Sequence, residues 1–341
     1  MAKNSNLHAA KTAKNDEFYT TLQDVEKELF HYREHFRDKT VLLNCDDPKW
    51  SAFWRYFHLC FKFLGLKKLI STHYEPDGSP SYALIYENPE GIQELDNDVE
   101  IGTTIPLKGN GDFRSPECIE FLKEADIVVT NPPFSLFREY VAQLVEYGKQ
   151  FLIIGNKNAI TYKEVFPLIK DGALWLGIYA VKEFRQTDGT IKKFGNIGWF
   201  TNLEHKKRHE PLILWREYAK TPEMFPRYDN YDAINVDKVC DIPIDYDGVM
   251  GVPITFLDKW NPEQFEIVEL GNSRDNFTPN KDYVCPKKHL KNGTVVSGGA
   301  INCVLAIEYD TAPVGIVYYT SENSKYLVPP YARILIRRRK T

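Results

Sequence analysis

The sequence predicts an α/β protein, a doubly wound and mostly parallel sheet followed by an irregular, partly β region. Short apolar runs alternate with helical patterns between residues 40 and 203, which is typical of a parallel sheet with helices on both faces. Polar side chains follow several of these runs, where ligands bind in such sheets. Beyond about residue 215, prolines, tyrosines and aspartates multiply and helical patterns stop. We therefore expect two domains, residues 1–214 and 215–341.

The first elements along the chain form a strand, helix, strand unit. A polar arm precedes an amphipathic helix with apolar residues at near-helical spacing, namely Leu22, Val25, Leu29 and Tyr32. A strand that ends in acids, an aromatic helix that stops at a glycine, and a second strand follow at residues 40–47, 51–65 and 67–75. Parallel strands need such a crossover, so a parallel sheet is expected.

The middle of the chain continues this alternation. Residues 76–110 are rich in turn residues and predict a hairpin or loop excursion on the sheet. The next expected elements are a helix at 117–125, a parallel strand at 126–130, a helix at 136–145, a strand at 151–156, a helix and a strand at 161–184, and an antiparallel neighbour at 196–203. In the C-terminal region we expect short strands within the runs 300–310 and 312–320.

Composition and cysteine spacing exclude several classes of protein. No apolar run approaches the roughly 18 residues of a membrane helix, and the N-terminal segment lacks the apolar core of a signal peptide, so we expect a cytoplasmic protein. The six cysteines never form a CxxC or CxxxC pair, which predicts neither a zinc site nor a disulfide framework. We interpret them as reduced thiols, most of them in the core.

Charge is distributed unevenly along the chain. The formal net charge is −4, but residues 281–341 carry 10 Lys and Arg against 4 Asp and Glu. This segment therefore has a balance of +6, and −10 remains for the preceding residues. The asymmetry indicates either a surface that meets an anion or a basic tail that keeps the chain soluble.

Acidic side chains follow the first two strands and a glycine turn. Asp46 and Asp47 could accept hydrogen bonds from a cofactor or cap the next helix, and no GxGxxG motif is present to bind a phosphate. Glu75 is either an acceptor for ribose hydroxyls or a solvated acid at a strand end. Asp112 could accept from the amine of adenine while Phe113 packs on its ring; the alternative is an ordinary turn beside a core Phe.

The most specific motif is Asn-Pro-Pro-Phe, directly after the strand at 126–130. The lone pair of an aromatic amine is delocalised into its ring, so this nitrogen is a poor nucleophile. Acceptors on the Asn131 side chain and the Pro132 carbonyl could hold both N–H bonds, and the turn through Pro133 would keep them rigid. Phe134 would stack on the ring. The alternative is a loop in which Asn131 caps a helix initiated by proline.

These motifs together resemble a known family. Thr130 to Phe134 resembles the (D/N/S)PP(Y/F/W) catalytic motif of S-adenosylmethionine-dependent amino-methyltransferases, and DEFYT resembles their N-terminal cofactor motif, with Thr21 where Pro is frequent. The motif order is that of the γ group of DNA adenine methyltransferases. DEFYT, REHF, LLNCDDP, LGLKKLI, TNPPFSLFREY, FGNIGWFTN and MGVPITFL resemble the EcoRI family of adenine-specific DNA methyltransferases, including its glycine-poor loop DDPKWSAF.

The resemblance implies a Rossmann-like class I methyltransferase sheet, S-adenosylmethionine as cofactor, and direct methyl transfer to adenine N6 without a metal. The implied cofactor residues, from the methionine end through the ribose to the adenine, are Phe18, Tyr19, Thr20, Asp46, Asp47, Glu75, Asp112 and Phe113. The implied residues around the target adenine are Asn131, Pro132, Pro133 and Phe134, with Trp199 or Phe200 packed against the base.

A base amine inside a duplex is out of reach, so such an enzyme flips its target out of double-stranded DNA. The C-terminal region would recognise the target and hold phosphates. Candidate phosphate contacts, several of which could be ordinary solvated charges, are Lys206, Lys207, Arg208, Lys287, Lys288, Lys291, Arg333, Arg337, Arg338, Arg339 and Lys340. We expect a monomer without membrane or metal partners, acting beside a cognate restriction endonuclease or as a protective phage methylase.

Two other classes of function stay open. The same chemistry could act on another planar amine, such as an RNA base, cytosine N4 or a protein glutamine. Alternatively, the chain could be a DNA-binding relic of the fold without turnover. A methyl-transfer assay with DNA, RNA and protein acceptors would distinguish the first alternative from methylation of DNA adenine. Failure to bind S-adenosylmethionine would favour the second alternative.

Overall fold

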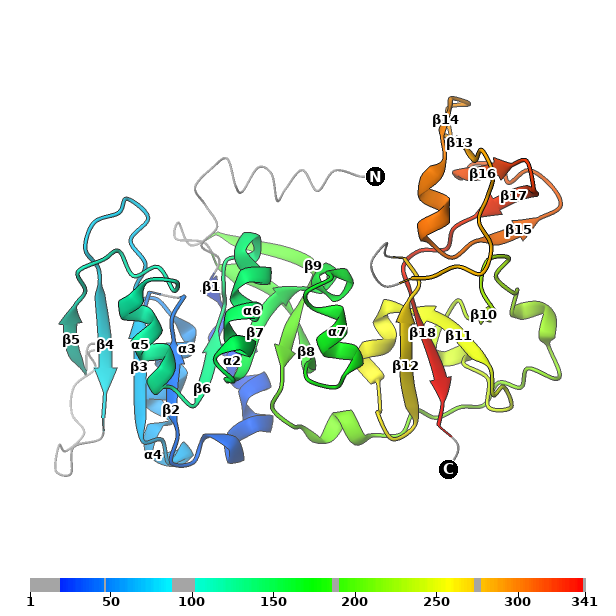
Figure 1. Cartoon of the computed structure of the whole chain (residues 1–341). Coiled ribbons are helices and arrows are strands. Elements are labelled where there is room, and N and C mark those ends of the chain that lie inside the picture. Colours follow the sequence, from blue (N-terminus) through cyan, green and yellow to red (C-terminus); the bar gives the residue numbers. More distant parts are fainter. Residues whose placement is uncertain (1–18, 46, 88–101, 186–189, 273–276, 340–341) are drawn as a thin grey trace. The chain divides into compact units, whose positions relative to one another are not determined.

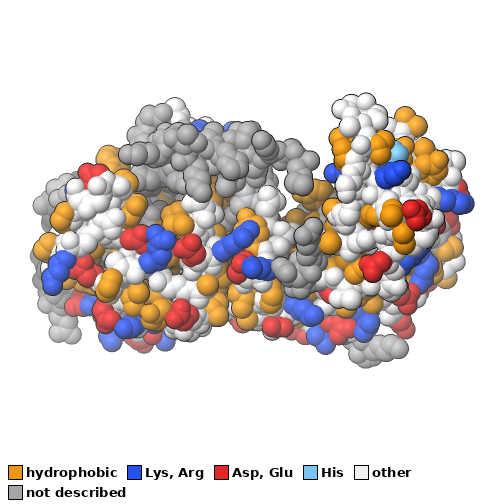
Figure 2. All heavy atoms as spheres, turned by 45° about the horizontal axis from the view of Figure 1, so that its top comes forward, with side chains coloured by type: hydrophobic (Ala, Val, Ile, Leu, Met, Phe, Trp, Pro, Cys, Tyr) orange, Lys and Arg blue, Asp and Glu red, His pale blue; other side chains and the backbone are white. Residues whose placement is uncertain are grey.

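The computed structural model divides the chain into two compact units (Figure 1). The first comprises Met1–Ala159 and Leu174–His205, and the second comprises Ile160–Ala173 and Lys206–Thr341. The domain boundary expected from the sequence, after residue 214, lies near the point between His205 and Lys206 where the chain enters the second unit for the last time. On the face drawn in Figure 2, basic and acidic side chains are interspersed. The structure describes residues 19–45, 47–87, 102–185, 190–272 and 277–339.

The first unit is built on a large mixed sheet, which confirms the predicted α/β class. In the described residues its strands lie in the order β1-β8-β9-β7-β6-β2-β3-β4-β5. The neighbours β7, β6, β2 and β3 are parallel, and the other pairings are antiparallel. The strands are β1 (Tyr19–Thr20), β2 (Thr40–Leu43), β3 (Lys68–Thr72), β4 (Tyr82–Tyr86), β5 (Thr103–Pro106), β6 (Ile127–Thr130), β7 (Gln150–Asn156), β8 (Trp175–Arg185) and β9 (Ile191–Thr201).

Antiparallel strands extend this sheet at both of its sides. β4 and β5 pair beside β3, within the segment predicted as a hairpin or loop excursion. β9 is the predicted antiparallel strand and pairs with both β7 and β8, although it begins at Ile191, before the expected start at residue 196. β8 lies beyond β9 and pairs with β1 at the edge.

Helices cover both faces of the sheet. The ring of Trp199 lies with its centroid 5.9 Å from that of Phe53 in α3, whereas the neighbouring Phe200 lies 5.1 Å from Phe137 in α6. Adjacent strand residues point to opposite faces, so α3 and α6 lie on opposite faces. The helices of this unit are α2 (Leu22–Leu29), α3 (Ala52–Leu59), α4 (Phe61–Leu64), α5 (Pro116–Glu124) and α6 (Phe137–Glu146), with 3-10 helices at Phe30–Phe36, Phe134–Leu136 and Lys157–Thr161.

Local chemistry sets several helix boundaries. The hydroxyl of Ser51 accepts a hydrogen bond from the backbone N–H of Trp54 at 3.3 Å and caps α3. The predicted aromatic helix is interrupted at Cys60 and continues as α4. Gly65, with φ of 65°, then ends α4 at the expected glycine stop.

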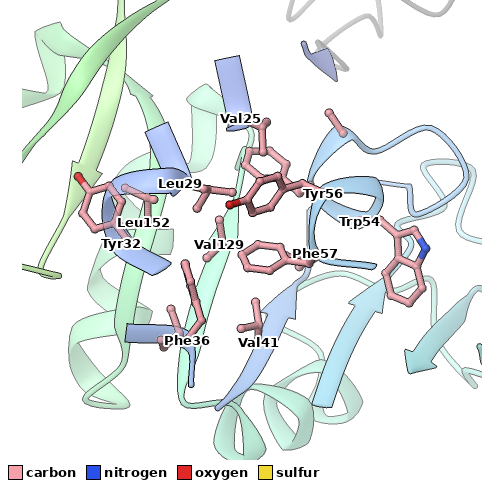
Figure 3. Close-up of a cluster of buried hydrophobic side chains, with 14 of the residues drawn as sticks. Val25, Leu29, Tyr32, Phe36, Val41, Trp54, Tyr56, Phe57, Val129 and Leu152 are labelled. Atoms are coloured by element: carbon pink, nitrogen blue, oxygen red, sulfur yellow. The ribbon is translucent and has the colours of Figure 1, made fainter. Parts of the chain in front are cut away.

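One hydrophobic core of the first unit lies between the sheet and helices α2 and α3 (Figure 3). The stripe predicted for the first helix is buried at Val25, Leu29 and Tyr32, although α2 ends at Leu29 and a 3-10 helix carries Tyr32. Val129 of β6 and Leu152 of β7 belong to the same cluster. Removal of this apolar surface from water is the main favourable term in folding the unit.

The second unit contains two sheets and one α-helix among its described residues. Only part of each strand run predicted at 300–310 and 312–320 is extended. In the first run a 3-10 helix at Gly299–Cys303 precedes β15 (Ile307–Tyr309), and in the second run the strand β16 begins only at Tyr318. The elements are α7 (Phe166–Lys170); a four-stranded sheet of β10 (Ala233–Asn235), β11 (Val249–Pro253), β18 (Arg333–Arg338) and β12 (Phe265–Leu270); a five-stranded sheet of β14 (Val295–Ser297), β13 (Lys287–His289), β16 (Tyr318–Ser321), β17 (Ser324–Val328) and β15 (Ile307–Tyr309); and 3-10 helices at Lys206–His209, Pro222–Met224, Val239–Asp241 and Ile254–Lys259.

All six cysteines are free thiols. Only Cys118 is buried, whereas Cys240 and Cys285 are exposed and the other three are partly buried. The prediction that most of them lie in the core is therefore wrong. Cys240 lies in a short 3-10 helix and Cys285 in an irregular segment before β13, and neither position faces a sheet core.

Candidate active site

The candidate site lies beyond the carboxyl ends of the central strands β6, β2 and β3 of the large sheet, where the strand order changes direction. The chain passes from β2 to its neighbour β3 on one side, and later forms β6 on the other side of β2. Ligands of such sheets bind beyond the carboxyl ends of the strands at this switch point. The segments that follow β2, β3 and β6 contain the acids and the Asn-Pro-Pro motif singled out in the sequence.

The Asn-Pro-Pro corner follows β6 directly. The strand ends at Thr130, and both Asn131 and Pro132 are buried, Asn131 with 9% of its surface exposed. The backbone N–H of Leu136 donates to the carbonyl of Pro133 at 2.9 Å and closes the turn that follows. Asn131 does not cap a helix, because neither the 3-10 helix at Phe134–Leu136 nor α6, which begins at Phe137, has a side-chain cap. The alternative reading of Asn131 as a helix cap is thus wrong.

The half-buried ring of Phe134 lies in an aromatic cluster. It meets Phe184 of β8 edge to face with centroids 6.4 Å apart, and Phe184 meets Phe194 of β9 in the same way at 5.5 Å. Phe184 is also the strand partner of Thr20 in β1, which links the N-terminal motif to the Phe134 corner. Phe184 and Phe194 were not predicted from the sequence, since only the pairing of β8 with β9 and β1 brings them here.

A histidine connects two of the predicted acids. Nδ1 of His73 lies 3.6 Å from Oδ2 of Asp47, and its Nε2 lies 3.3 Å from Oε2 of Glu75. The hydroxyl of Tyr82 donates to Oδ1 of Asp47 at 3.1 Å. The side chain of Asp47 also accepts from the backbone N–H of Lys49 at 2.9 Å, so it orders the loop after β2. His73 and Tyr82 were not predicted from the sequence. The signal that could have indicated His73 is its position two residues before Glu75, at the end of the same strand.

The loop of residues 109–113, which contains two glycines, lies against the end of β3. The backbone N–H of Glu75 donates to the carbonyl of Asn110 at 2.7 Å. Gly111 has φ of 78°, and a Cβ at this position would lie 1.8 Å from the carbonyl oxygen of His73. Only glycine permits so close an approach of two backbones at this φ. The loop thereby brings Asp112 to the edge that carries Asp47 and Glu75.

Asp112 is held by an arginine. The guanidinium of Arg114 donates to both carboxylate oxygens of Asp112, at 2.9 and 2.7 Å, and reaches Glu139 at 2.9 Å. The hydrogen bonds from Arg114 lower the pKa of Asp112, so this carboxyl is ionised at neutral pH. The backbone N–H of Arg114 also donates to Oδ1 of Asp112, at 2.9 Å. A carboxylate has about four lone-pair sites, so these three hydrogen bonds leave acceptor capacity on Oδ2 for a ligand.

Three residues connect Asp112 with the end of β2. Phe113 is buried, and its ring meets that of Tyr140 edge to face with centroids 5.0 Å apart. The hydroxyl of Tyr140 donates to Oδ1 of Asn44, which follows β2 and is buried. Asn44 and Tyr140 escaped the sequence analysis because a buried polar pair 96 residues apart leaves no local pattern.

Other predicted site residues are placed less favourably or lie outside the described residues. Phe18 and Asp46 are outside them, and Tyr19 is described by its backbone pairing with β8 alone. Trp199 and Phe200 are core side chains with 1% and 0% of their surface exposed. The prediction that one of them packs against a target base therefore stays a prediction.

The basic residues predicted to bind phosphate differ in their surroundings. Lys206 is exposed, whereas the guanidinium of Arg208 lies 5.6 Å from the ring of Trp260. Arg333 in β18 is buried and donates a hydrogen bond to the side chain of Asn235 at 3.0 Å. The prediction that Arg333 contacts phosphate is therefore wrong, because its side chain does not lie on the surface. The remaining candidates are Lys207, half-buried; Arg337, paired with Glu266; Arg339, bonded to the Pro262 carbonyl; Arg338, half-buried; and Lys340, outside the described residues.

Two absences concern only the part of the chain that the structure describes. There, no helix is long and apolar enough to cross a membrane. The same residues contain no group of three or more His, Cys, Asp and Glu side chains placed to hold a metal ion.

The fold and the candidate site together define the class: an α/β enzyme whose candidate ligand-binding residues gather at the switch point of its sheet. The family model described as "Adenine-specific methyltransferase EcoRI" matches residues 6–339, and the chain belongs to this family of adenine-specific DNA methyltransferases. The chain is 47% identical to the type II methyltransferase M.EcoRI of Escherichia coli, over 84% of this chain and 95% of the relative. It is 42% identical to M.MpnI of Mycoplasma pneumoniae, over 77% and 85%. No solved structure gave a significant match.

Proposed function

We propose that this methyltransferase transfers the methyl group of S-adenosylmethionine directly to N6 of an adenine flipped out of double-stranded DNA. Membership of the family gives the adenine specificity and the transfer of a methyl group. The cofactor, the duplex and the role of each residue are the proposal. The observation that carries it is the buried Asn131-Pro132 corner at the switch point, beside the row of carboxylates after β2 and β3.

The residues at the sheet edge fit S-adenosylmethionine. The ribose hydroxyls, the amino group and the adenine amine of this cofactor are hydrogen-bond donors, and Asp47, Glu75 and Asp112 are acceptors at the same edge. Nδ2 of Asn44 is buried and makes no hydrogen bond with a described residue, so it is available to the cofactor carboxylate. Phe18 and Asp46 complete the proposed set on the strength of the resemblance. When bound, the cofactor supplies a methyl group on a positively charged sulfur.

The Asn-Pro-Pro corner would activate the amine. The Asn131 side-chain oxygen and the Pro132 carbonyl oxygen would accept hydrogen bonds from its two N–H groups, so that the nitrogen could become pyramidal and direct its lone pair at the methyl carbon. The N–C bond forms as the C–S bond breaks, and one proton leaves the nitrogen for solvent. Rigid acceptors stabilise this transition state more than the planar ground state. Phe134 would stack on the flipped base.

We further propose that the first unit is a Rossmann-like class I methyltransferase domain and that the region 215–341 recognises the DNA target. The parallel order β7-β6-β2-β3 with helices on both faces supports the first assignment. The +6 balance of residues 281–341 supports the second. The printed names of the relatives, type II methyltransferases, support a role as the modification enzyme of a restriction-modification system.

Substitution of Asn131 tests the proposal. We expect Asn131→Ala to lower kcat by about two orders of magnitude, because it removes one acceptor that acts in the transition state. Cofactor affinity and thermal midpoint should change little. Turnover is measured as transfer of labelled methyl from S-adenosylmethionine to unmodified genomic DNA, followed by mapping of N6-methyladenine.

Asn131→Asp is the matched control, because it keeps an acceptor at the same position and should retain more turnover than Asn131→Ala. Near-normal turnover of Asn131→Ala would refute the assigned role. RNA, protein and cytosine-containing acceptors in the same assay test the other planar amines. Absence of S-adenosylmethionine binding by the unsubstituted protein would leave only the DNA-binding relic.

A further inference from the structure

The five-stranded sheet of the second unit has two unlike faces. Directly paired residues of neighbouring strands lie on the same face, and so do residues two apart. Lys288 is paired with Tyr319 of β16, which is buried in a cluster with Leu327 of β17. This side of the sheet therefore covers a core. The opposite side carries the residues that we call the ribbon face: Lys287, His289, Val295, Ser297, Tyr318 and Thr320.

Aromatic rings continue the ribbon face across the sheet. The imidazole of His289 stacks on Tyr318 with centroids 4.6 Å apart and planes 7° apart, and its Nε2 lies 2.9 Å from the hydroxyl of Thr320. Tyr318 meets Tyr326 of β17 edge to face at 5.7 Å, and Tyr326 is paired with Tyr309 of β15.

The outer strands of the ribbon face expose apolar surface. Val295 in β14 is 49% exposed, and Tyr309 in β15, at the other edge, is 45% exposed. The hairpin formed by β13 and β14 extends away from the rest of the second unit in Figure 1. Exposed apolar side chains on a projecting ribbon, rimmed by charges, mark an interaction surface.

The exposed lysines of this hairpin lack the acidic partners that several other cations of the second unit have. Lys287 and Lys291 are exposed, and within the described residues neither forms an ion pair. By contrast, Lys281 is paired with Asp229 at 2.7 Å and Lys325 with Asp310 at 2.6 Å. The sequence from 283 to 307 contains no Asp or Glu. In Figure 2, Lys or Arg and His side chains lie among hydrophobic ones in the upper part of the second unit.

We propose that the ribbon face is the surface through which the second unit binds duplex DNA, with the β13–β14 hairpin at a groove. The inference rests on the proposed function. A two-stranded ribbon fits the major groove, lysines without acidic partners can neutralise phosphates, and apolar side chains such as Val295 can contact thymine methyl groups. Lys287 and Lys291 carry the phosphate contacts, and the rings of His289 and Tyr318 form the floor between them. Lys288 lies on the core side, with Nζ 5.8 Å from the Tyr319 ring.

The salt dependence of DNA binding tests the lysines. The plot of log K against log salt concentration has a negative slope, and each lost phosphate contact makes this slope less steep by about 0.9. At about 0.1 M salt, this change corresponds to about an eightfold loss of affinity relative to the unsubstituted protein. We expect Lys287→Gln and Lys291→Gln each to show this change with a duplex that contains the methylation site. Lys325→Gln removes the same charge from the same sheet, but from an ion pair with Asp310, and should leave the slope unchanged.

Tyr318→Ala tests the apolar part of the ribbon face. It should weaken binding severalfold without altering the slope, because no phosphate contact is lost, whereas Tyr318→Phe should retain the affinity. Wild-type slopes for both lysine variants would overturn the inference, and so would equal effects of Lys287→Gln and Lys325→Gln. The inference would also be overturned if the lysine variants bound single-stranded DNA more weakly than the unsubstituted protein but bound the duplex equally well.

Failure of the proposed function has a different outcome. In that case the unsubstituted protein neither binds S-adenosylmethionine nor methylates the duplex. If only the ribbon face is wrongly assigned, the unsubstituted protein does both, and the lysine variants do so with unchanged affinity and slope. Thermal midpoints of all variants, measured in parallel, show that a loss of DNA binding is not a loss of folding.

Discussion

At the scale of single residues, Gly111 is the position where the candidate site depends most on backbone conformation. Its φ of 78° is strained for other residues, and a Cβ would lie 1.8 Å from the carbonyl oxygen of His73. We expect Gly111→Ala to push the loop away from β3 and so to separate Asp112 from Glu75. Cofactor affinity, measured by calorimetric titration, should fall by at least about tenfold, with a lower thermal midpoint as well.

Gly109→Ala is the control for this change. It alters the same loop, but its Cβ would meet only Oε2 of Glu117, at 3.5 Å, which is ordinary van der Waals contact. The variant should bind the cofactor nearly as well as the unsubstituted protein. Equal losses in the two variants would contradict the role given to Gly111.

The sequence predicted those residues of the candidate site that are marked by local chemistry. Two prolines after an apolar run located the corner at Asn131, and acids at strand ends located Asp47 and Glu75. His73 and Asn44 had no such mark, since their partners come from different strands and from α6. The tertiary structure, rather than any spacing along the chain, places them in the site.

At the scale of elements, a buried carboxylate fixes α2 to the sheet. Glu28 accepts hydrogen bonds from the backbone N–H groups of Ile178 and Tyr179 in β8, at 2.7 and 2.8 Å, and from the hydroxyl of Tyr32 at 3.0 Å. The register of β8 with β9 shifts between Leu176 and Ala180, so these N–H groups need an acceptor outside the ladder. Glu28 supplies it.

We therefore expect Glu28→Ala to destabilise the first unit. One buried donor, the Tyr32 hydroxyl, and two partly buried backbone N–H groups would lose their acceptor, at a cost of up to about 1–3 kcal/mol for each donor left unsatisfied. Urea unfolding followed by tryptophan fluorescence measures the change in the free energy of unfolding. Glu26→Ala changes an exposed acid on the same helix and should alter stability by less than about 0.5 kcal/mol. Similar values for the two variants would show that Glu28 does not anchor α2.

Elements were predicted well where periodicity is strong and poorly where strands are short. The apolar runs of β2, β6 and β7 lie where expected, because strands buried on both faces are almost continuously hydrophobic. In the second unit strands of three residues such as β13 and β14 carry too few residues to show an alternation. Their pairing is set by the sheet as a whole.

At the scale of the whole molecule, carboxyl groups in both units couple folding to pH. The hydrogen bonds from the Arg114 side chain lower the pKa of Asp112 in the first unit. In the second unit, the backbone N–H of Lys325 and the hydroxyl of Ser324 lower the pKa of Glu308. Burial raises the pKa of Glu269, which acts in the opposite direction.

A lowered pKa in the folded state means that the unfolded chain binds more protons at acidic pH. The stabilisation from Asp112 and Glu308 is complete above their unfolded pKa values, about 3.9 and 4.3, and is lost as the pH falls through the folded values. We therefore expect the free energy of unfolding to decline below about pH 4, as measured by urea titrations between about pH 3 and 6. Asp112→Asn and Glu308→Gln should each flatten this acid limb, because the substituted side chain no longer titrates. An acid limb as steep as that of the unsubstituted protein in both variants would mean that other carboxyl groups carry the pH dependence.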